Sequence, residues 1–311
     1  MYPGLKTIKQ KAGAPFFLSV SSSVLKSSEL KMLKEINPAG IIYFKRNIEN
    51  CESLQYLIKS TCSVDSIKYH AVDEEGGRVR RLPAGEWSLP SMLEIAENGN
   101  LFATEKIDVL GRKLQSIGIN MNMAPNVDLR SGENTSIVGD RSFGEDPQQV
   151  IQFAEIYIEM MKKNGIYPVL KHFPGHGTTT VDSHKSLPVI NKPLDALFEE
   201  DLLPYKALAN KAGFVMVAHL LHPDVSDLPA TLSREWNEIL RKNTGFKGIS
   251  MTDDMEMHAL DSYSYLEKME LFYESGIDML LVCSGNEEAI SGFFEASVRM
   301  VEKGVSGKFK H

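Results

Sequence analysis

The sequence predicts a single (β/α)8 barrel of the TIM type. Eight short apolar runs rich in Val, Ile, Phe and Met alternate with longer segments of helical periodicity, the pattern of repeated strand and helix units. Titratable residues follow several of these runs directly, and the carboxyl ends of parallel barrel strands open on one face. A doubly wound open sheet is the alternative. No GxGxxG follows the first run, however, and eight regular units favour a closed barrel.

The expected strands are short, and the helical segments between them supply the crossovers. The strands are predicted at Pro15–Val20, Gly40–Phe44, Lys68–Val72, Ile117–Met123, Tyr167–Leu170, Phe214–Ala218, Gly248–Met251 and Asp278–Cys283. The helices are predicted at Ser27–Ile36, Cys51–Thr61, Phe102–Ser116, Gln149–Asn164, Leu194–Ala212, Ser233–Lys242, Leu260–Ser275 and Glu287–Lys303.

No linker, internal repeat or low-complexity tract interrupts the pattern, so we expect one catalytic domain over residues 1–311. The longest irregular stretch, Asn126–Asp146, contains three glycines and is better interpreted as an active-site loop than as a domain boundary.

Composition and charge argue against several classes of partner. The formal net charge of −7 and the absence of a basic run argue against nucleic acid or an anionic membrane surface. No apolar run approaches the roughly 18 residues of a membrane helix, and the N-terminal segment lacks the order of a secretory signal. Three scattered cysteines are typical of reduced thiols. We expect a cytoplasmic protein and, without a second domain, a monomer.

Acids and arginines follow the third run. The segment Ala71–Leu82, AVDEEGGRVRRL, ends a strand in three carboxylates, turns at two glycines and then presents three arginines. Carboxylates accept hydrogen bonds from paired sugar hydroxyls, and arginine binds a carboxylate or a hydroxyl. A solvated charge cluster at a turn is the alternative interpretation, and the position at a strand end argues against it.

A second arginine motif lies in the glycine-rich stretch. In SIVGDRSFGEDP, Ser136–Pro147, Arg141 stands between Asp140 and Phe143, as in a ligand clamp. The acids that precede Pro147 suit the start of a helix, because proline and negative charge both favour its first turn. We therefore assign Arg141 to ligand binding and these acids to structure.

The densest set of proton-transfer groups runs from Lys171 to His184 and reads KHFPGHGTTTVDSH. Its histidines are either buried hydrogen-bonding groups or metal ligands. Lys171 and His172 are adjacent, so their side chains face opposite sides of an extended strand unless the backbone bends. The Pro174-Gly175 pair is suited to such a turn.

The end of this segment predicts an acid and base. Asp182 and His184 are two residues apart, so an extended loop places both side chains on one side. A carboxylate there orients the imidazole and favours its protonated form, which makes His184 a candidate general acid and base near neutral pH.

The seventh run ends in the adjacent acids Asp253 and Asp254. One of them should project into the pocket, and we expect the other to cap the following helix. A carboxylate that faces the anomeric carbon of a sugar is a competent nucleophile.

Five of these motifs, DEEGGRVRRL, GDRSFGEDP, KHFPGHG, DSH and TDDMEM, occur in an order that resembles glycoside hydrolase family 3. More narrowly, they resemble its single-domain bacterial β-N-acetylglucosaminidases of peptidoglycan recycling. The resemblance spans roughly residues 14–285, and the combination of KHFPGHG with DSH is the most specific part of it.

The resemblance implies a TIM-like barrel and a retaining exo-glycosidase that needs no cofactor or metal. Its substrate would be a small carbohydrate, a muropeptide or chitooligosaccharide that ends in N-acetylglucosamine. The nucleophile matches Asp253, and the acid/base matches His184 with Asp182 as its partner. Residues that hold the terminal sugar match Asp73, Arg81, Arg141, Lys171 and His172, and a loop-supporting residue matches His176.

The sequence departs from the family pattern at a few positions. Glu74 stands where glutamine is usual, Thr178 where many members have aspartate, and Met255-Glu256 where Leu-Ser is common. None of these changes removes an implied catalytic group, although Glu256 could alter the rim of the pocket.

Three other functions compete with hydrolysis by this mechanism. A neutral imidazole does not repel phosphate as a carboxylate does, so phosphorolysis of the same substrates is one alternative. A metal-dependent barrel hydrolase is another, but the first strand lacks an HxH pair and Lys171 would place a cation beside the metal. The third is a sugar-binding barrel without catalysis, which the presence of all three implied catalytic residues disfavours.

Overall fold

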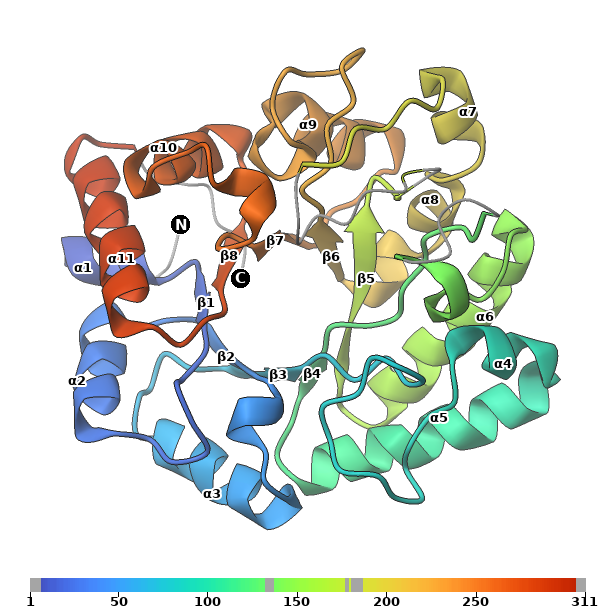
Figure 1. The fold of residues 1–311 in the computed structure, drawn as a ribbon, viewed down its shortest axis with the longest axis horizontal. Helices are drawn as coiled ribbons and strands as arrows, with labels where there is room; N and C mark the ends of the chain where they lie inside the picture. Colours follow the sequence, from blue (N-terminus) through green and yellow to red (C-terminus); the bar gives the residue numbers. More distant parts are fainter. Residues whose placement is uncertain (1–6, 132–136, 177–178, 180–186, 306–311) are drawn as a thin grey trace.

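Eight parallel strands close into a barrel in the computed structural model, which describes residues 7–131, 137–176, 179 and 187–305 (Figure 1). Each strand pairs with its neighbours in chain order, and β1 pairs with β8 to close the ring. The predicted (β/α)8 barrel is therefore confirmed. The strands are β1 (Phe16–Leu18), β2 (Gly40–Tyr43), β3 (Tyr69–Val72), β4 (Met121–Asn122), β5 (Tyr167–Phe173), β6 (Phe214–Val217), β7 (Ile249–Asp254) and β8 (Met279–Val282).

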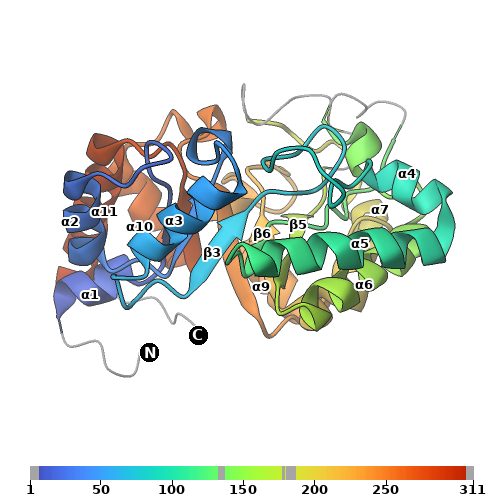
Figure 2. The ribbon, with the colours of Figure 1, turned by 90° about the horizontal axis from the view of Figure 1, so that it is seen from below.

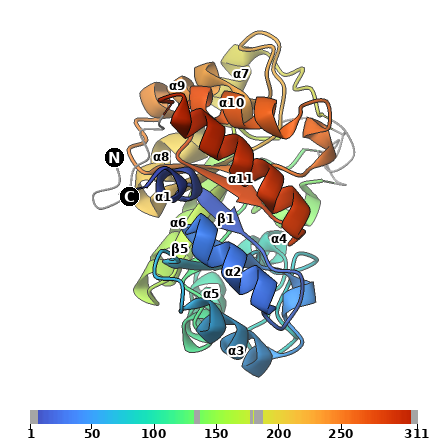
Figure 3. The same ribbon diagram turned by 90° about the vertical axis from the view of Figure 1, so that its left-hand side faces the viewer.

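Helices surround the barrel, and α1 and α2 pack beside α11 where the first and last units meet (Figures 1 and 3). The α-helices are α1 (Ile8–Gly13), α2 (Ser27–Ile36), α3 (Cys51–Thr61), α4 (Met92–Glu97), α5 (Gly99–Ser116), α6 (Pro147–Lys163), α7 (Leu194–Glu199), α8 (Leu203–Ala212), α9 (Arg234–Asn243), α10 (Tyr265–Ser275) and α11 (Glu287–Glu302). Short 3-10 turns are η1 (Lys45–Asn47), η2 (Gly139–Arg141), η3 (Ala230–Leu232) and η4 (His258–Leu260). Within the described residues, none of these helices combines the length and hydropathy needed to cross a bilayer.

Local sequence explains where two helices differ from their prediction. The segment expected as one helix from Leu194 divides into α7 and α8, because Pro204 belongs in the first turn of a new helix, where its missing N–H costs nothing. Helix α10 begins later than expected, because Ser264 Oγ accepts from the Glu267 N–H and the Glu267 carboxylate accepts from the Ser264 N–H, which forms a capping box.

The inside of the barrel is filled at its amino-terminal end. Methionines and other apolar residues from several strands form a buried cluster that includes Phe17, Met121, Val169 and Met251. Burying each such side chain contributes about 1.5–3 kcal/mol relative to leaving it exposed. A second, larger cluster lies between the strands and the outer helices. Because the interior is packed in this way, space for a ligand remains only toward the carboxyl ends of the strands.

Two strands extend further than the apolar pattern predicted. Strand β5 continues through Lys171 and His172 to Phe173, and β7 continues to Asp254. The pairing register shifts in both strands, between Leu170 and Phe173 in β5 and between Met251 and Asp254 in β7. These irregular strand ends carry the polar motifs into the open mouth of the barrel. The side view shows the loops gathered along one edge of the molecule (Figure 2).

Candidate active site

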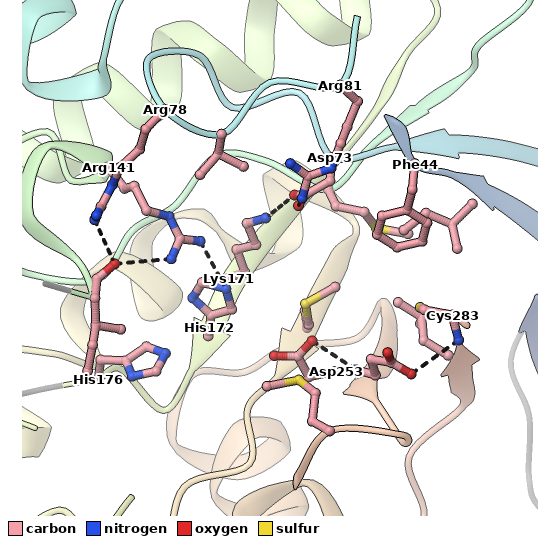
Figure 4. A pocket seen from close by; sticks show the side chains of 18 residues that line it. Phe44, Asp73, Arg78, Arg81, Arg141, Lys171, His172, His176, Asp253 and Cys283 are labelled. Atoms are coloured by element: carbon pink, nitrogen blue, oxygen red, sulfur yellow. Dashed lines mark hydrogen bonds and ion pairs between the residues drawn. The ribbon is translucent and has the colours of Figure 1, made fainter. Parts of the chain in front are cut away.

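A pocket of about 370 Å³ opens at the carboxyl ends of the strands (Figure 4). It collects seven of the nine predicted site residues, which come from β5, β7 and the loops that follow β3, β4 and β5. The other two, Asp182 and His184, lie outside the described residues, as does Thr178. The predicted residues that line the pocket are Asp73, Arg81, Arg141, Lys171, His172, His176 and Asp253.

Asp73 binds two cations at one wall of the pocket. Its Oδ2 lies 2.6 Å from Nη2 of Arg81, and its Oδ1 forms an ion pair with Nζ of Lys171. Arg81 also lies over the ring of Phe44, with 5.7 Å between the guanidinium carbon and the ring centroid. Asp73 and Arg81 thus hold each other in place at the pocket wall, which leaves their remaining lone pairs and N–H groups for ligand hydroxyls.

Behind this wall lies a buried acid that the sequence interpretation did not single out. The carboxylate of Glu75 accepts a forked pair of hydrogen bonds from Arg141, at 2.8 and 2.7 Å, and lies 2.5 Å from Nζ of Lys171. Burial raises the pKa of Glu75, but the charges of Arg141 and Lys171 outweigh burial and hold it well below its usual value. Glu75 therefore orients two predicted sugar-binding cations at once.

A second buried acid, Asp128, holds both histidines of the KHFPGHG motif. Its Oδ2 accepts from Nδ1 of His172 at 2.8 Å, and its Oδ1 accepts from the backbone N–H groups of His172 and His176 at 3.3 and 3.1 Å. Burial raises the pKa of Asp128, yet His172 and His176 bring it down to about 2. Asp128 is thus the residue that supports the loop, and His176 contributes its backbone to that support.

The same three side chains have the composition of a metal site. Ligand atoms of Asp128, His172 and His176 lie within 4.8 Å of one another. However, Nδ1 of His172 is already hydrogen-bonded to Asp128, and Nη2 of Arg141 lies 3.5 Å from its Nε2. A cation between these groups would face the Arg141 guanidinium directly, so the cluster fits a hydrogen-bonded support better than a metal centre.

His176 remains a buried, weakly basic group. Burial lowers its pKa to about 4, and the nearby charges of Asp128 and Asp253 offset only part of that effect. Its ring meets that of His172 edge to face, with 5.1 Å between the centroids. At neutral pH His176 therefore presents an uncharged imidazole to the pocket.

The two acids at the end of β7 have different surroundings. Asp253 lines the pocket, and its Oδ1 accepts from the Asp254 N–H at 2.8 Å. Asp254 does not cap the next helix, as the sequence had led us to expect, because Ser264 occupies that position. Its Oδ1 instead accepts from the N–H groups of Glu256 and Cys283, at 3.1 and 3.2 Å, and so ties the turn after β7 to the end of β8.

Asp254 also titrates abnormally. Burial is the main cause that raises its pKa to about 7, and the charge of Glu256 adds to the effect. Glu256 itself accepts from the Ser284 N–H at 2.7 Å, outside the pocket lining. Glu256, which stands where serine is common, thus affects the pocket by raising the pKa of Asp254.

Glu74, which stands where glutamine is usual in the family pattern, accepts hydrogen bonds from the backbone. Its Oε2 accepts from the N–H groups of Arg81 and Leu82, at 2.7 and 2.8 Å. A glutamine oxygen would accept the same two bonds, so this departure leaves the wall of the pocket intact.

The pocket thus combines a polar wall of fixed acids and cations with the carboxylate of Asp253 on β7, and apolar residues such as Ile42, Phe44 and Met257 line the rest. Such a lining suits a small polyhydroxylated ligand. This combination on a TIM barrel is typical of enzymes that act on sugars.

Comparison with known proteins agrees with this class. The sequence model of the glycosyl hydrolase family 3 N-terminal domain matches residues 8–307. The chain belongs to this family and is therefore a glycoside hydrolase. Among curated relatives, a beta-hexosaminidase from Tolumonas auensis is 36% identical over 285 residues, which cover 89% of this chain and 85% of the relative. A beta-hexosaminidase from Pseudomonas aeruginosa is 33% identical over 280 residues, 88% of this chain and 83% of the relative.

Solved structures show the same fold. A family 3 beta-N-acetylglucosaminidase from Paenibacillus sp. superposes with a TM-score of 0.90 at 30% identity, covering 97% of this chain but only 59% of that protein. NagZ from Neisseria gonorrhoeae, solved with N-trifluoroacetyl-D-glucosamine, superposes with a TM-score of 0.84 at 29% identity, covering 96% of this chain and 91% of that one.

Proposed function

We propose that this glycoside hydrolase is a retaining exo-β-N-acetylglucosaminidase, of the β-N-acetylhexosaminidase type. The observation that carries the proposal is the position of Asp253, whose carboxylate shares one pocket with the fixed cluster of Asp73, Arg141 and Lys171. A terminal sugar bound by its hydroxyls to that cluster has its anomeric carbon toward β7. The names of the relatives support N-acetylglucosamine as that sugar.

The proposed reaction has two steps. Asp253 attacks the anomeric carbon while His184, assisted by Asp182, protonates the leaving oxygen, and a covalent glycosyl-aspartate forms. Water, activated by His184 as a base, then releases the sugar with its original anomeric configuration. The sequence DSH and its resemblance to the family motif support the roles of Asp182 and His184.

Asp73, Arg81, Arg141, Lys171 and His172 are proposed to hold the hydroxyls of the terminal sugar. Because their partners fix them before the ligand arrives, little side-chain entropy is lost on binding. These contacts should strengthen as the ring flattens toward the oxocarbenium-like transition state.

The nucleophile is tested with a nitrophenyl N-acetyl-β-D-glucosaminide. We expect turnover by the wild type and its loss in Asp253→Ala, with the N-acetylglucosamine product still bound by the variant. An activated 5-fluoro N-acetylglucosaminide, which keeps the 2-acetamido group and slows the second step, should leave a glycosyl group on Asp253, detected by mass spectrometry of the peptide. Equal turnover by the wild type and Asp253→Ala would refute the proposal.

The roles of Asp182 and His184 are tested by leaving groups. A nitrophenolate leaves without protonation, whereas a sugar does not, so His184→Ala should lose far more activity on chitobiose than on the nitrophenyl substrate. Equal losses on both substrates would exclude His184 as the acid.

We further propose that the natural substrates are peptidoglycan fragments in the cytoplasm and that the barrel acts as a single-domain monomer. The family match over residues 8–307 supports the single domain. Light scattering of the purified chain measures the oligomeric state, and competition between a disaccharide muropeptide and chitobiose ranks the substrates. A clear preference for chitobiose would contradict the proposed fragments.

A further inference from the structure

The turn that follows Asp253 is held by buried side chains from two other elements. The carbonyl oxygen of Asp254 accepts from Nε2 of His219, at the end of β6, over 2.8 Å. The next carbonyl, that of Met255, accepts from Nζ of Lys268 on α10, also over 2.8 Å. The Met255 N–H donates to Leu281 of β8 at 2.9 Å. Two consecutive peptide units after the proposed nucleophile are thus fixed from β6, β8 and α10.

Lys268 occupies an unfavourable place for a cation. It is only 6% exposed and lies in the first turn of α10, where the helix dipole repels positive charge. Burial lowers its pKa, and the charges of Asp261, Glu256 and Asp254 offset that effect only in part. An apolar side chain would avoid this desolvation cost, so a lysine at this position is not explained by the stability of the fold alone.

The contact made by Lys268 lies close in the chain to the carboxylate of Asp253. The Met255 carbonyl lies two peptide units after the Asp254 N–H, which donates to Oδ1 of Asp253 at 2.8 Å. A rotation of this turn would therefore displace the donor that aligns the Asp253 carboxylate. Lys268 itself does not line the pocket, so it reaches the substrate only through the turn.

We propose that Lys268 is a positioning residue for Asp253, which it holds in line with the anomeric carbon through the Met255 carbonyl. This proposal rests on the proposed function, because it takes Asp253 as the nucleophile. His219 makes the parallel contact from inside the barrel. Lys268 gives the cleaner test, because a change on α10 leaves the pocket lining untouched.

The test compares Lys268→Met with Tyr273→Phe on the same helix. The Tyr273 hydroxyl pairs with Oγ of Ser297 on α11, at 2.8 Å, so its removal takes one buried hydrogen bond from α10 without touching the β7 turn. Because small misplacements of reacting groups cost up to about 100-fold in rate, we expect Lys268→Met to lose on the order of 10-fold to 100-fold in kcat. Its KM, and both constants of Tyr273→Phe, should stay within about twofold of the wild type.

Two further measurements test whether a charged donor restores kcat and whether each variant is folded. Lys268→Arg keeps a charged donor and should regain part of the kcat lost in Lys268→Met, while thermal melting shows that each variant is folded. If Lys268→Met does not fold, Lys268→Leu, which also removes the donor to the Met255 carbonyl, replaces it, and a low kcat with native melting supports the proposal. Wild-type kcat in the folded variant, or a loss confined to KM, would overturn it. No turnover by the wild type would instead overturn the proposed function, and this assignment with it.

Discussion

Nδ1 of His172 donates to Oδ2 of Asp128 over 2.8 Å, at a site where both side chains are buried. The same carboxylate accepts two backbone N–H groups of the KHFPGHG segment through its other oxygen. One acid therefore orients the imidazole, whose Nε2 lies 3.5 Å from Nη2 of Arg141, and fixes the backbone that carries it.

Replacing Asp128 by asparagine should impair both stability and binding. The carboxylate accepts three hydrogen bonds through two oxygens, and an amide of the same shape turns an NH2 group toward at least one of the donors. A hydrogen bond to a charged group contributes about 1.5–3 kcal/mol. We expect a loss of about that size in denaturant unfolding and a higher KM for the nitrophenyl substrate.

Asp108→Asn is the matched control for this prediction. Asp108 pairs at the surface with Lys163 and Arg112, and such pairs contribute about 0–1 kcal/mol. Equal losses of stability in Asp108→Asn and Asp128→Asn would contradict the special role of the buried acid.

The adjacent residues Glu74 and Glu75 should respond differently to the same change. Glu75→Gln removes the charge that pairs with Arg141 and Lys171, and breaking such a buried pair costs several kcal/mol. We expect KM to rise by about 10-fold or more, since each factor of ten corresponds to about 1.4 kcal/mol. Glu74→Gln keeps both backbone hydrogen bonds and should leave KM unchanged. Steady-state kinetics measure KM of the two variants. A similar KM in Glu74→Gln and Glu75→Gln would refute this prediction.

The abnormal Asp254 predicts how stability depends on pH. Its pKa is about 7 in the folded chain and near 3.8 when unfolded, so the folded state binds the extra proton between these values. Asp254 therefore lowers stability progressively as pH rises from about 4 to 7. Asp254→Asn removes this titration, and its stability relative to the wild type should increase by about 3 kcal/mol between pH 5 and pH 8.

Denaturant unfolding at the two pH values measures this difference. Glu256→Gln serves as a second variant, because it removes the neighbouring charge that helps to raise the pKa of Asp254. In Glu256→Gln, the pH range over which Asp254 lowers stability should shift toward lower pH. A constant stability difference between Asp254→Asn and the wild type would show that Asp254 titrates normally.

A charged network at the opposite end of the barrel should affect stability alone. Arg241 on α9 donates to Oδ2 of Asp278 at 2.5 Å, and the N–H and hydroxyl of Ser250 donate to the same oxygen. Arg241→Ala leaves Asp278, which is 3% exposed, without its cation and should cost about 3 kcal/mol. Its kcat should equal that of the wild type, because the network lies at the amino ends of β7 and β8.

Arg234→Ala on the same helix is the control for that change. Arg234 is exposed and lies 3.9 Å from Glu238, so its loss should change stability by less than about 0.5 kcal/mol. A reduced kcat in folded Arg241→Ala would show that the network reaches the active site.

The amino-acid pattern alone predicted the barrel, and it predicted that residues such as Asp73, Lys171 and Asp253 would meet at its mouth. Apolar runs spaced by helical segments leave few topologies, and a parallel barrel brings the ends of its strands together wherever they occur in the chain. For this reason Asp73, Lys171 and Asp253 could be expected in one pocket although they belong to three distant segments. The fold also gave Asp146 its expected place as the cap of α6.

The tertiary contacts were needed to separate the acids that line the pocket from those that hold other residues in place. Glu75 and Asp128 follow strands just as Asp73 does, but their partners come from other strands and loops. Alternation of side chains could not assign them, because both acids lie beyond the ends of β3 and β4, where the period of two of a strand no longer applies. The role of Asp254 was likewise set by contacts with β8, which no local pattern around Asp253 contains.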